Sequence, residues 1–240
     1  MKKIFLVLIL VIAIAASASV VSRNNEELTP TLIQSLHLPL TTKVAAEGEN
    51  LIVFTNVDST EDDGMDVVKL WVYRPKSGKL LKLLTTNPNG EYECLSYGDK
   101  AKKVALESIP TISFVYINAE EDKLLVEGFD ERNSYVYIIS LIKGLPTIQL
   151  PCNAGVYGMS FEQGLPVGQS YAYYKKGGRY NIISVFDWEG NSLKHINLKK
   201  VQQRNNSNAQ LYVQQLEKCF DKIAGKDGRG YCGYFLADMD

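Results

Sequence analysis

From residue 43 onward, apolar and polar residues alternate, and Gly, Asn, Asp and Pro interrupt the alternation at short intervals. Successive side chains of a β-strand point to opposite faces, so this alternation, rich in Val, Ile, Tyr and Phe, predicts half-buried strands. Glycines in Trp188-Glu189-Gly190-Asn191 and Lys176-Gly177-Gly178 fit tight hairpin turns. We therefore predict an all-β protein with strands at 43–46, 51–56, 67–74, 80–85, 91–97, 103–107, 113–118, 123–128, 134–141, 147–150, 155–161, 169–174, 180–187 and 192–198.

One order of segments recurs along the chain. An apolar strand is followed by a polar loop, an aromatic-rich strand, a turn and a final short strand, in residues 49–84, 123–150 and 169–198. Such copies are typical of antiparallel meander units, as in the blades of a β-propeller. The predicted fold is therefore all-β with β-propeller-like meander repeats, and a β-sandwich, which shows the same local alternation, is the alternative.

After residue 198 the period of the apolar positions becomes helical. Tyr212, Leu216, Cys219, Phe220 and Ile223 form one apolar stripe, which predicts a single helix at about 208–224. A last strand is expected at 231–237. Near the other end, a short helix is expected at 31–36, with a proline just before its first residue.

The first residues resemble a secretory signal peptide. Lys2 and Lys3 precede an unbroken apolar run at 4–16, and Ala16-Ser17-Ala18 places small side chains where the signal peptidase cuts. We predict a signal peptide at 1–18, an N-terminal segment at 19–42 and a single β-domain at 43–240.

This leader predicts an exported protein, periplasmic or extracellular, that meets the membrane only through the signal segment before cleavage. The alternative is an N-terminal membrane anchor, because residues 4–21 approach the length of about 20 residues that spans a bilayer.

Charge gives no indication of a nucleic-acid partner. The chain has 26 basic and 27 acidic residues and a formal net charge of −1. Binding to phosphates requires basic residues gathered on one face, whereas the lysine pairs at 102–103, 175–176 and 199–200 are scattered and lie beside predicted turns. We interpret them as solvated surface, and expect no nucleic acid as a partner.

The four cysteines, Cys94, Cys152, Cys219 and Cys232, would enter an oxidising compartment if the chain is exported. Three pairings are possible. A Cys219–Cys232 disulfide is the preferred pairing, because it would join the predicted terminal helix to the predicted terminal strand. The cysteines lack the C-x-x-C spacing of a zinc site, so no metal or other cofactor is predicted.

Catalytic chemistry has few candidates in this sequence. Glycoside hydrolysis uses two carboxylates about 5 to 9 Å apart, and Glu107, Glu127, Asp130 and Asp187 lie at or near predicted strand ends. Turn residues occupy the same positions, so none is predicted to be catalytic. Cys152 with His195 would be a thiol and its base, but a buried or disulfide-bonded cysteine and a surface histidine are the preferred interpretation.

Tyrosines provide the best candidates for a binding surface. Tyr171, Tyr173 and Tyr174 lie close together on one predicted strand, and Arg179 and Tyr180 follow across a turn. Tyr offers a large contact area together with a polar hydroxyl group. Cross-strand packing is the competing explanation. These five residues are the predicted binding site for a protein or glycan.

The hairpin at 185–194, in which a strand ending in Phe186-Asp187 leads through Trp188-Glu189-Gly190-Asn191 into the next strand, resembles hairpins of exported propellers of the TolB-like, six-bladed type. Residues 123–150 resemble the preceding blade. Without residues 1–18, the chain is shorter than six blades of about 40 residues each. The resemblance implies an exported scaffold that binds a partner.

Besides an envelope protein retained by its N-terminal segment, two hypotheses for function follow. The first is an exported, non-catalytic, β-propeller-like domain that binds a protein or glycan. The second is a hydrolase or lyase that acts on polysaccharide through paired carboxylates. Convergent buried carboxylates would favour the enzyme, and an exposed aromatic patch would favour binding.

Overall fold

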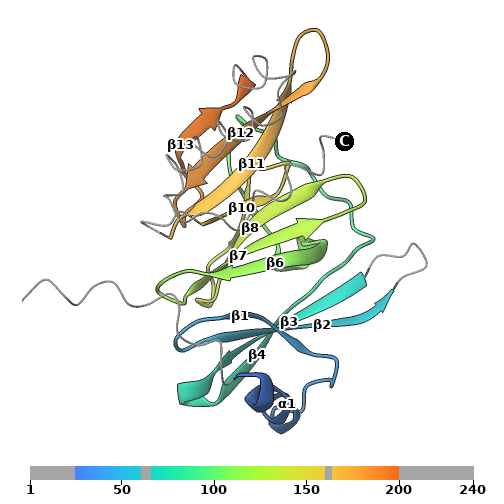
Figure 1. Ribbon diagram of the computed structural model, residues 1–240, viewed down its shortest axis with the longest axis vertical. Coiled ribbons are helices and arrows are strands. Elements are labelled where there is room, and N and C mark those ends of the chain that lie inside the picture. Colours follow the sequence, from blue (N-terminus) through green and yellow to red (C-terminus); the bar gives the residue numbers. More distant parts are fainter. Residues whose placement is uncertain (1–24, 61–65, 160–163, 200–240) are drawn as a thin grey trace, which may run out of the picture. The chain divides into compact units, whose positions relative to one another are not determined.

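The computed structural model describes residues 25–60, 66–159 and 164–199 (Figure 1). The chain divides into two compact units, residues 1–42 and 43–240. The predicted signal peptide, the helix at 208–224, the strand at 231–237, and Cys219 and Cys232 all lie outside the described residues.

The first unit contains the helix α1, Asn25–Ser35. The predicted helix at 31–36 began too late, because Pro30 lies inside α1 rather than before it. At the other end His37 has a φ of 56°, and its N–H donates to the Gln34 carbonyl while the Leu38 N–H donates to the Ile33 carbonyl. This double closure is a Schellman motif, which ends the helix. No helix in the described ranges has the length and apolar character needed to cross a membrane.

The second unit contains three antiparallel sheets. The first sheet has the strand order β1 (Lys43–Glu47), β2 (Ile52–Thr60), β3 (Asp66–Arg74) and β4 (Lys79–Thr85). The second has the order β5 (Lys102–Val104), β9 (Thr147–Leu150), β8 (Ser134–Ser140), β7 (Lys123–Phe129) and β6 (Thr111–Ile117). The third has the order β10 (Val156–Met159), β11 (Pro166–Tyr173), β12 (Arg179–Phe186) and β13 (Ser192–Asn197). Short 3₁₀ helices lie at Pro75–Ser77 and Leu106–Ser108.

The predicted all-β fold with antiparallel meander repeats is confirmed. Each of the three sequence copies forms the last three strands of one meander, and the preceding strand, β1, β6 or β10, completes it. The second sheet departs from the pattern, because β5 adds to its β9 edge.

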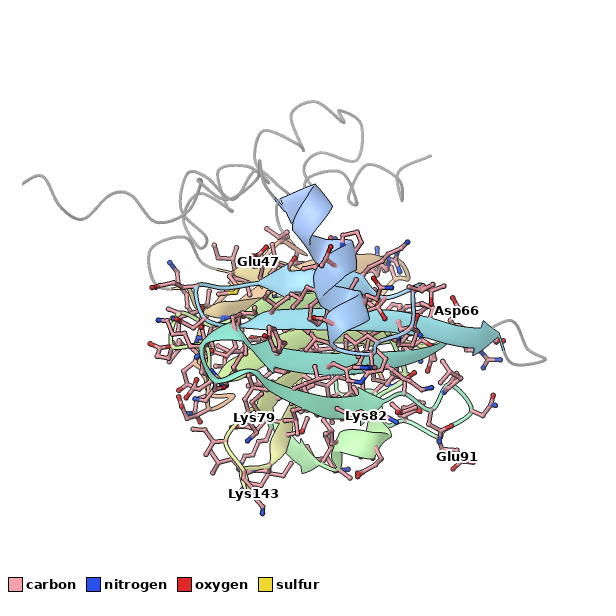
Figure 2. The ribbon with its side chains drawn as sticks, turned by 90° about the horizontal axis from the view of Figure 1, so that it is seen from below. Glu47, Asp66, Lys79, Lys82, Glu91 and Lys143 are labelled. Carbon is pink, nitrogen blue, oxygen red and sulfur yellow. The ribbon has the colours of Figure 1, made fainter. Side chains whose placement is uncertain are left out.

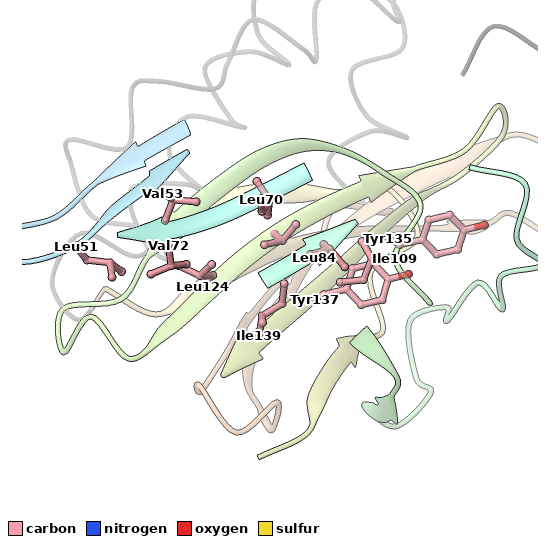
Figure 3. Packing of buried hydrophobic residues seen from close by; sticks show 11 residues of the cluster. Leu51, Val53, Leu70, Val72, Leu84, Ile109, Leu124, Tyr135, Tyr137 and Ile139 are labelled. Atoms are coloured by element: carbon pink, nitrogen blue, oxygen red, sulfur yellow. The ribbon is translucent and has the colours of Figure 1, made fainter. Parts of the chain in front are cut away.

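Two hydrophobic cores cover opposite faces of the second sheet. Its side chains alternate along β7 and β8, so that Leu124 and Tyr137 join the first sheet in one core (Figure 3), whereas Leu125 and Val136 join Phe186 of the third sheet in the other. A strand buried on both faces has a nearly continuous apolar sequence, as β7 and β8 do. Three packed layers distinguish this unit from a two-layer sandwich.

The predicted strand at 91–97 is wrong. This segment has no strand pairing and connects the first sheet to β5. Side-chain hydrogen bonds hold the segment in place instead. Gln149 Nε2 donates to the Glu93 carbonyl at 2.8 Å, and the Tyr92 hydroxyl of the segment donates to the Asn87 carbonyl. Tyr92 packs against the core between the first and second sheets, and Leu95 is 6% exposed. This burial produced the strand-like alternation.

One edge of the first sheet carries charge. The last strand, β4, exposes Lys79 and Lys82 (Figure 2). Lysines on an edge strand oppose its pairing with another chain. We therefore do not expect a strand of a partner to add to β4.

Candidate binding site on the β11–β12 hairpin

The hairpin of β11 and β12 carries all five predicted site residues. Tyr173 is paired with Arg179, Ala172 with Tyr180, and Tyr171 with Asn181. The turn between the strands closes with a hydrogen bond from the Tyr174 N–H to the Gly178 carbonyl at 3.0 Å. Positive φ angles of 94° at Gly177 and 83° at Gly178 confirm the predicted glycine turn.

The register places the five residues on two faces of the hairpin. Since alternate residues share a face and paired residues lie side by side, Tyr171, Tyr173 and Arg179 are together on one face, which we call the arginine face. Tyr174 and Tyr180 lie on the opposite face, with Lys199, and we call these three residues the lysine face. Sequence proximity alone could not make this separation.

The arginine face presents an exposed aromatic and a fixed cation. The rings of Tyr171 and Tyr173 meet edge to face with centroids 5.7 Å apart. The Arg179 guanidinium carbon lies 5.5 Å from the centre of the Tyr171 ring, within the range of a cation–π contact. Tyr173 is 68% exposed, so its ring is available to a ligand.

Burial is the main cause of a raised pKa at Tyr171, and Tyr173 adds to the shift while the Arg179 charge opposes it. Tyr171 is therefore a neutral phenol at pH 7, able both to donate and to accept a hydrogen bond.

The lysine face is held together by its own contacts. The rings of Tyr174 and Tyr180 have centroids 4.9 Å apart, and Lys199 Nζ lies 5.3 Å from the centre of the Tyr180 ring. The Tyr174 hydroxyl donates to the Lys199 carbonyl at 3.0 Å. These contacts tie the end of β13 to the hairpin, which is a structural role. Sequence analysis missed Lys199 because only the pairing of β12 with β13 brings residue 199 to the hairpin.

The side of the hairpin that carries the lysine face packs on the second sheet. On that side the Ser170 hydroxyl donates to the Pro151 carbonyl at 2.8 Å, and Phe186 belongs to the core shared with the second sheet. The side with the arginine face is directed away from the second sheet. Exposure on that side increases along the strands, from Val167 and Ile183, at 1% and 0%, to Tyr173 at the turn.

Two of the candidate carboxylates hold hairpin turns. Asp130 Oδ1 accepts the N–H groups of Arg132 and Asn133, both at 2.7 Å, and Asp187 Oδ1 accepts those of Glu189 and Asn191. Burial alone would raise the pKa of each carboxyl, but hydrogen bonds, including one from Tyr135 to Asp130, lower both pKa values below the ordinary value. Turn carboxyl groups with lowered pKa values are poor general acids.

Glu127 and Glu107 lie in different surroundings. Burial raises the pKa of Glu127, although hydrogen bonds from the Val156 N–H and the Ser134 side chain oppose the shift. One Glu127 oxygen accepts the Val156 N–H at 3.0 Å, so the carboxylate joins β7 to the start of β10. Glu107 is exposed on a 3₁₀ helix. Three of the four candidate carboxylates therefore accept backbone N–H groups.

Cys152 and His195 occupy different surroundings. Cys152 is 2% exposed within the core between the second and third sheets, and burial raises the pKa of its thiol. The exposed His195 ring instead contacts Tyr97, with centroids 5.4 Å apart. Cys94 and Cys152 are free thiols. Within residues 25–60, 66–159 and 164–199, no group of three or more His, Cys, Asp or Glu side chains could hold a metal ion.

Comparisons with known proteins do not assign the chain to a family. No protein-family model matches it, and no curated protein matches it. One similar solved structure is an acylaminoacyl peptidase in complex with Z-Gly-Gly-Phe-chloromethyl ketone, with 12% sequence identity and a TM-score of 0.40. The match covers 70% of this chain and 26% of that chain, so the present chain spans about a quarter of the peptidase. A likeness of this strength does not establish a shared fold or activity.

Proposed function

We propose that this chain is an exported, non-catalytic, β-propeller-like domain that binds a protein or glycan partner through the β11–β12 hairpin. The observation that carries the proposal is the arginine face, where Tyr173 is 68% exposed beside the stacked Tyr171 and Arg179. An exposed aromatic next to a fixed cation is a common anchor for recognition.

The surrounding scaffold supports this role. The hairpin projects from a sheet that is packed on a neighbouring sheet through Phe186 and Ser170. A rigid base lets a ligand bind with little loss of conformational entropy in the protein. The second function considered, hydrolysis or cleavage of polysaccharide, has weaker support because Asp130, Asp187 and Glu127 already hold backbone N–H groups.

A photo-crosslinker tests the binding role directly. We expect Tyr173→p-benzoylphenylalanine, expressed with its leader in an exporting host, to form adducts with a partner on irradiation. The matched control is Lys82→p-benzoylphenylalanine, also on an exposed strand position but in the first sheet. Equal labelling at the two positions, or no adduct at position 173, would contradict the proposal.

Export has its own measurement. If the leader is cleaved after Ala18, intact mass of the exported protein will correspond to a chain that begins at Ser19. A full-length mass in the membrane fraction would instead support an N-terminal anchor.

A further inference from the structure

We propose that the partner of the arginine face is an acidic polysaccharide, in which sugar rings lie against Tyr173 and carboxylate groups pair with the surrounding cations. This inference rests on the proposed binding function and names the class of ligand.

Charge is the first argument. The hairpin from Tyr171 to Phe186 contains Lys175, Lys176 and Arg179 and no Asp or Glu. Lys175 and Lys176 are exposed at the turn, and Arg179 is exposed beside it. The two lysines create a local positive potential on a chain whose formal net charge is −1. A concentrated potential of this kind attracts an anionic ligand.

The aromatic residues are the second argument. Tyr173 lies directly opposite Arg179 in the register, so an exposed ring and a guanidinium are neighbours on one surface. The contact between Arg179 and the Tyr171 ring holds the guanidinium beside that surface, which reduces the entropy lost when it pairs with a carboxylate. A uronic acid unit matches this surface, because its sugar face can pack on the Tyr173 ring while its carboxylate accepts hydrogen bonds from the neighbouring guanidinium.

The limited apolar area distinguishes a glycan from a protein partner. Protein interfaces have an apolar core with several buried anchors. On β11 and β12, Tyr173 is the single large hydrophobic residue that is exposed, and its neighbours at the turn are Lys175 and Lys176. One exposed ring among hydrogen-bond donors suits a polar, ring-shaped ligand better than a protein surface.

A nucleic acid is a poorer match for the same surface. A duplex or single strand is bound through many phosphate contacts along a groove. Here the cations are gathered at one turn, and the fold places the other lysine pair of the described chain, Lys102 and Lys103, on the second sheet.

The test compares two polymers with the same backbone by isothermal titration calorimetry: polygalacturonate, and its fully methyl-esterified form, in which each charged carboxylate is replaced by a neutral ester. We expect the intact mature protein to bind polygalacturonate, and to bind the ester at least tenfold more weakly. Raising the salt concentration should weaken binding to polygalacturonate, because exposed ion pairs are screened.

Variants locate the site. Arg179→Ala should weaken binding to polygalacturonate by about tenfold, the loss expected for one charge-assisted hydrogen bond, and the double variant Lys175→Ala/Lys176→Ala by a similar factor. Tyr173→Ala should weaken it by about fivefold. The matched control, Lys79→Ala/Lys82→Ala, removes two exposed lysines from the first sheet and should leave the affinity unchanged. Thermal melting of each variant shows whether it is folded.

Three results would overturn the inference: no binding to polygalacturonate, equal binding to the ester, or an equal loss in the control variant. The crosslinking experiment separates these failures from failure of the binding role. If position 173 forms adducts with a protein or a neutral glycan while polygalacturonate does not bind, the acidic ligand is rejected and the binding function stands.

Discussion

Glu121 accepts the backbone N–H of Asn50 with both carboxylate oxygens, each at 2.9 Å. Glu121 lies in the turn between β6 and β7 of the second sheet, and Asn50 in the turn between β1 and β2 of the first sheet. Arg74 at the end of β3 donates from Nη2 to the Glu121 carbonyl at 3.0 Å. The Glu121 turn therefore joins two sheets that are separate in sequence.

The same turn also reaches the third sheet. Lys123 Nζ lies 2.8 Å from Glu189 Oε1, in the turn between β12 and β13. Asn118 organises the turn, because its Oδ1 accepts the N–H groups of Asp122 and Lys123 at 3.0 and 2.7 Å. Polar contacts at the ends of the strands thus supplement the two apolar cores.

Replacing Glu121 tests this contact. Glu121→Gln keeps the size of the side chain but removes its charge and leaves one oxygen as an acceptor, so we expect a loss of about 1–2 kcal/mol in the free energy of unfolding. Urea denaturation measures this free energy of unfolding. The control is Glu107→Gln, on an exposed position, which should change the free energy by less than about 0.5 kcal/mol. Equal values for the two variants would show that the contact with Asn50 does not stabilise the fold.

Gly168→Ala tests the packing of the third sheet on the second. A Cβ atom at position 168 would lie 2.2 Å from Cys152 Sγ, which is too close for any non-bonded contact. We expect destabilisation of about 1–3 kcal/mol from overpacking. Gly168→Ala should cost less stability when it is made in the Cys152→Ala variant than in the original protein, because removing the thiol makes room for the methyl group. Additive losses in this double-mutant cycle would contradict the close packing of these two residues.

Glu127 should make stability depend on pH. Burial raises the pKa of Glu127 above its ordinary value of 4.5, against the opposing hydrogen bonds from Val156 and Ser134. Between the ordinary and the raised pKa, the folded protein holds a proton that the unfolded chain has released. The contribution of Glu127 to stability therefore falls as pH rises through that window.

Glu127→Gln removes this titration. The free energy of unfolding of the original protein, relative to that of the variant, should decrease as pH rises from the ordinary pKa of 4.5 through the raised pKa of the folded state. Urea denaturation at several pH values measures the difference. A difference that stays constant across this range would show that the pKa of Glu127 is the same in the folded and unfolded states.

Phe220→Ala tests the helix predicted at 208–224. If the stripe that contains Phe220 is buried, the substitution should cost about 3–5 kcal/mol and lower the melting midpoint. Glu217→Ala, which lies outside the stripe at a helical spacing, is the control and should have little effect. An unchanged midpoint for Phe220→Ala would reject the packing of this segment.

Strand positions were predictable where local physics decides them. Residues adjacent in sequence form the apolar runs of β7 and β8. They also determine the positive φ angles of Gly177 and Gly178 in the β11–β12 turn. The segment at 91–97 was not predictable in this way. Its alternation reflects burial between sheets, whereas a strand requires a hydrogen-bonded neighbour that the sequence does not reveal.

The candidate site shows the same division. Sequence alone selected the tyrosines and Arg179 and placed them at one hairpin, because alternation and a glycine turn are local signals. The register of β11 against β12 decided that Tyr173 and Arg179 share a face while Tyr174 lies opposite. The tertiary structure alone brought Lys199 to Tyr180 and Glu121 to Asn50. Both contacts join residues from separate segments. The first forms when β13 pairs with β12, and the second forms when the first and second sheets bury their apolar faces against one another.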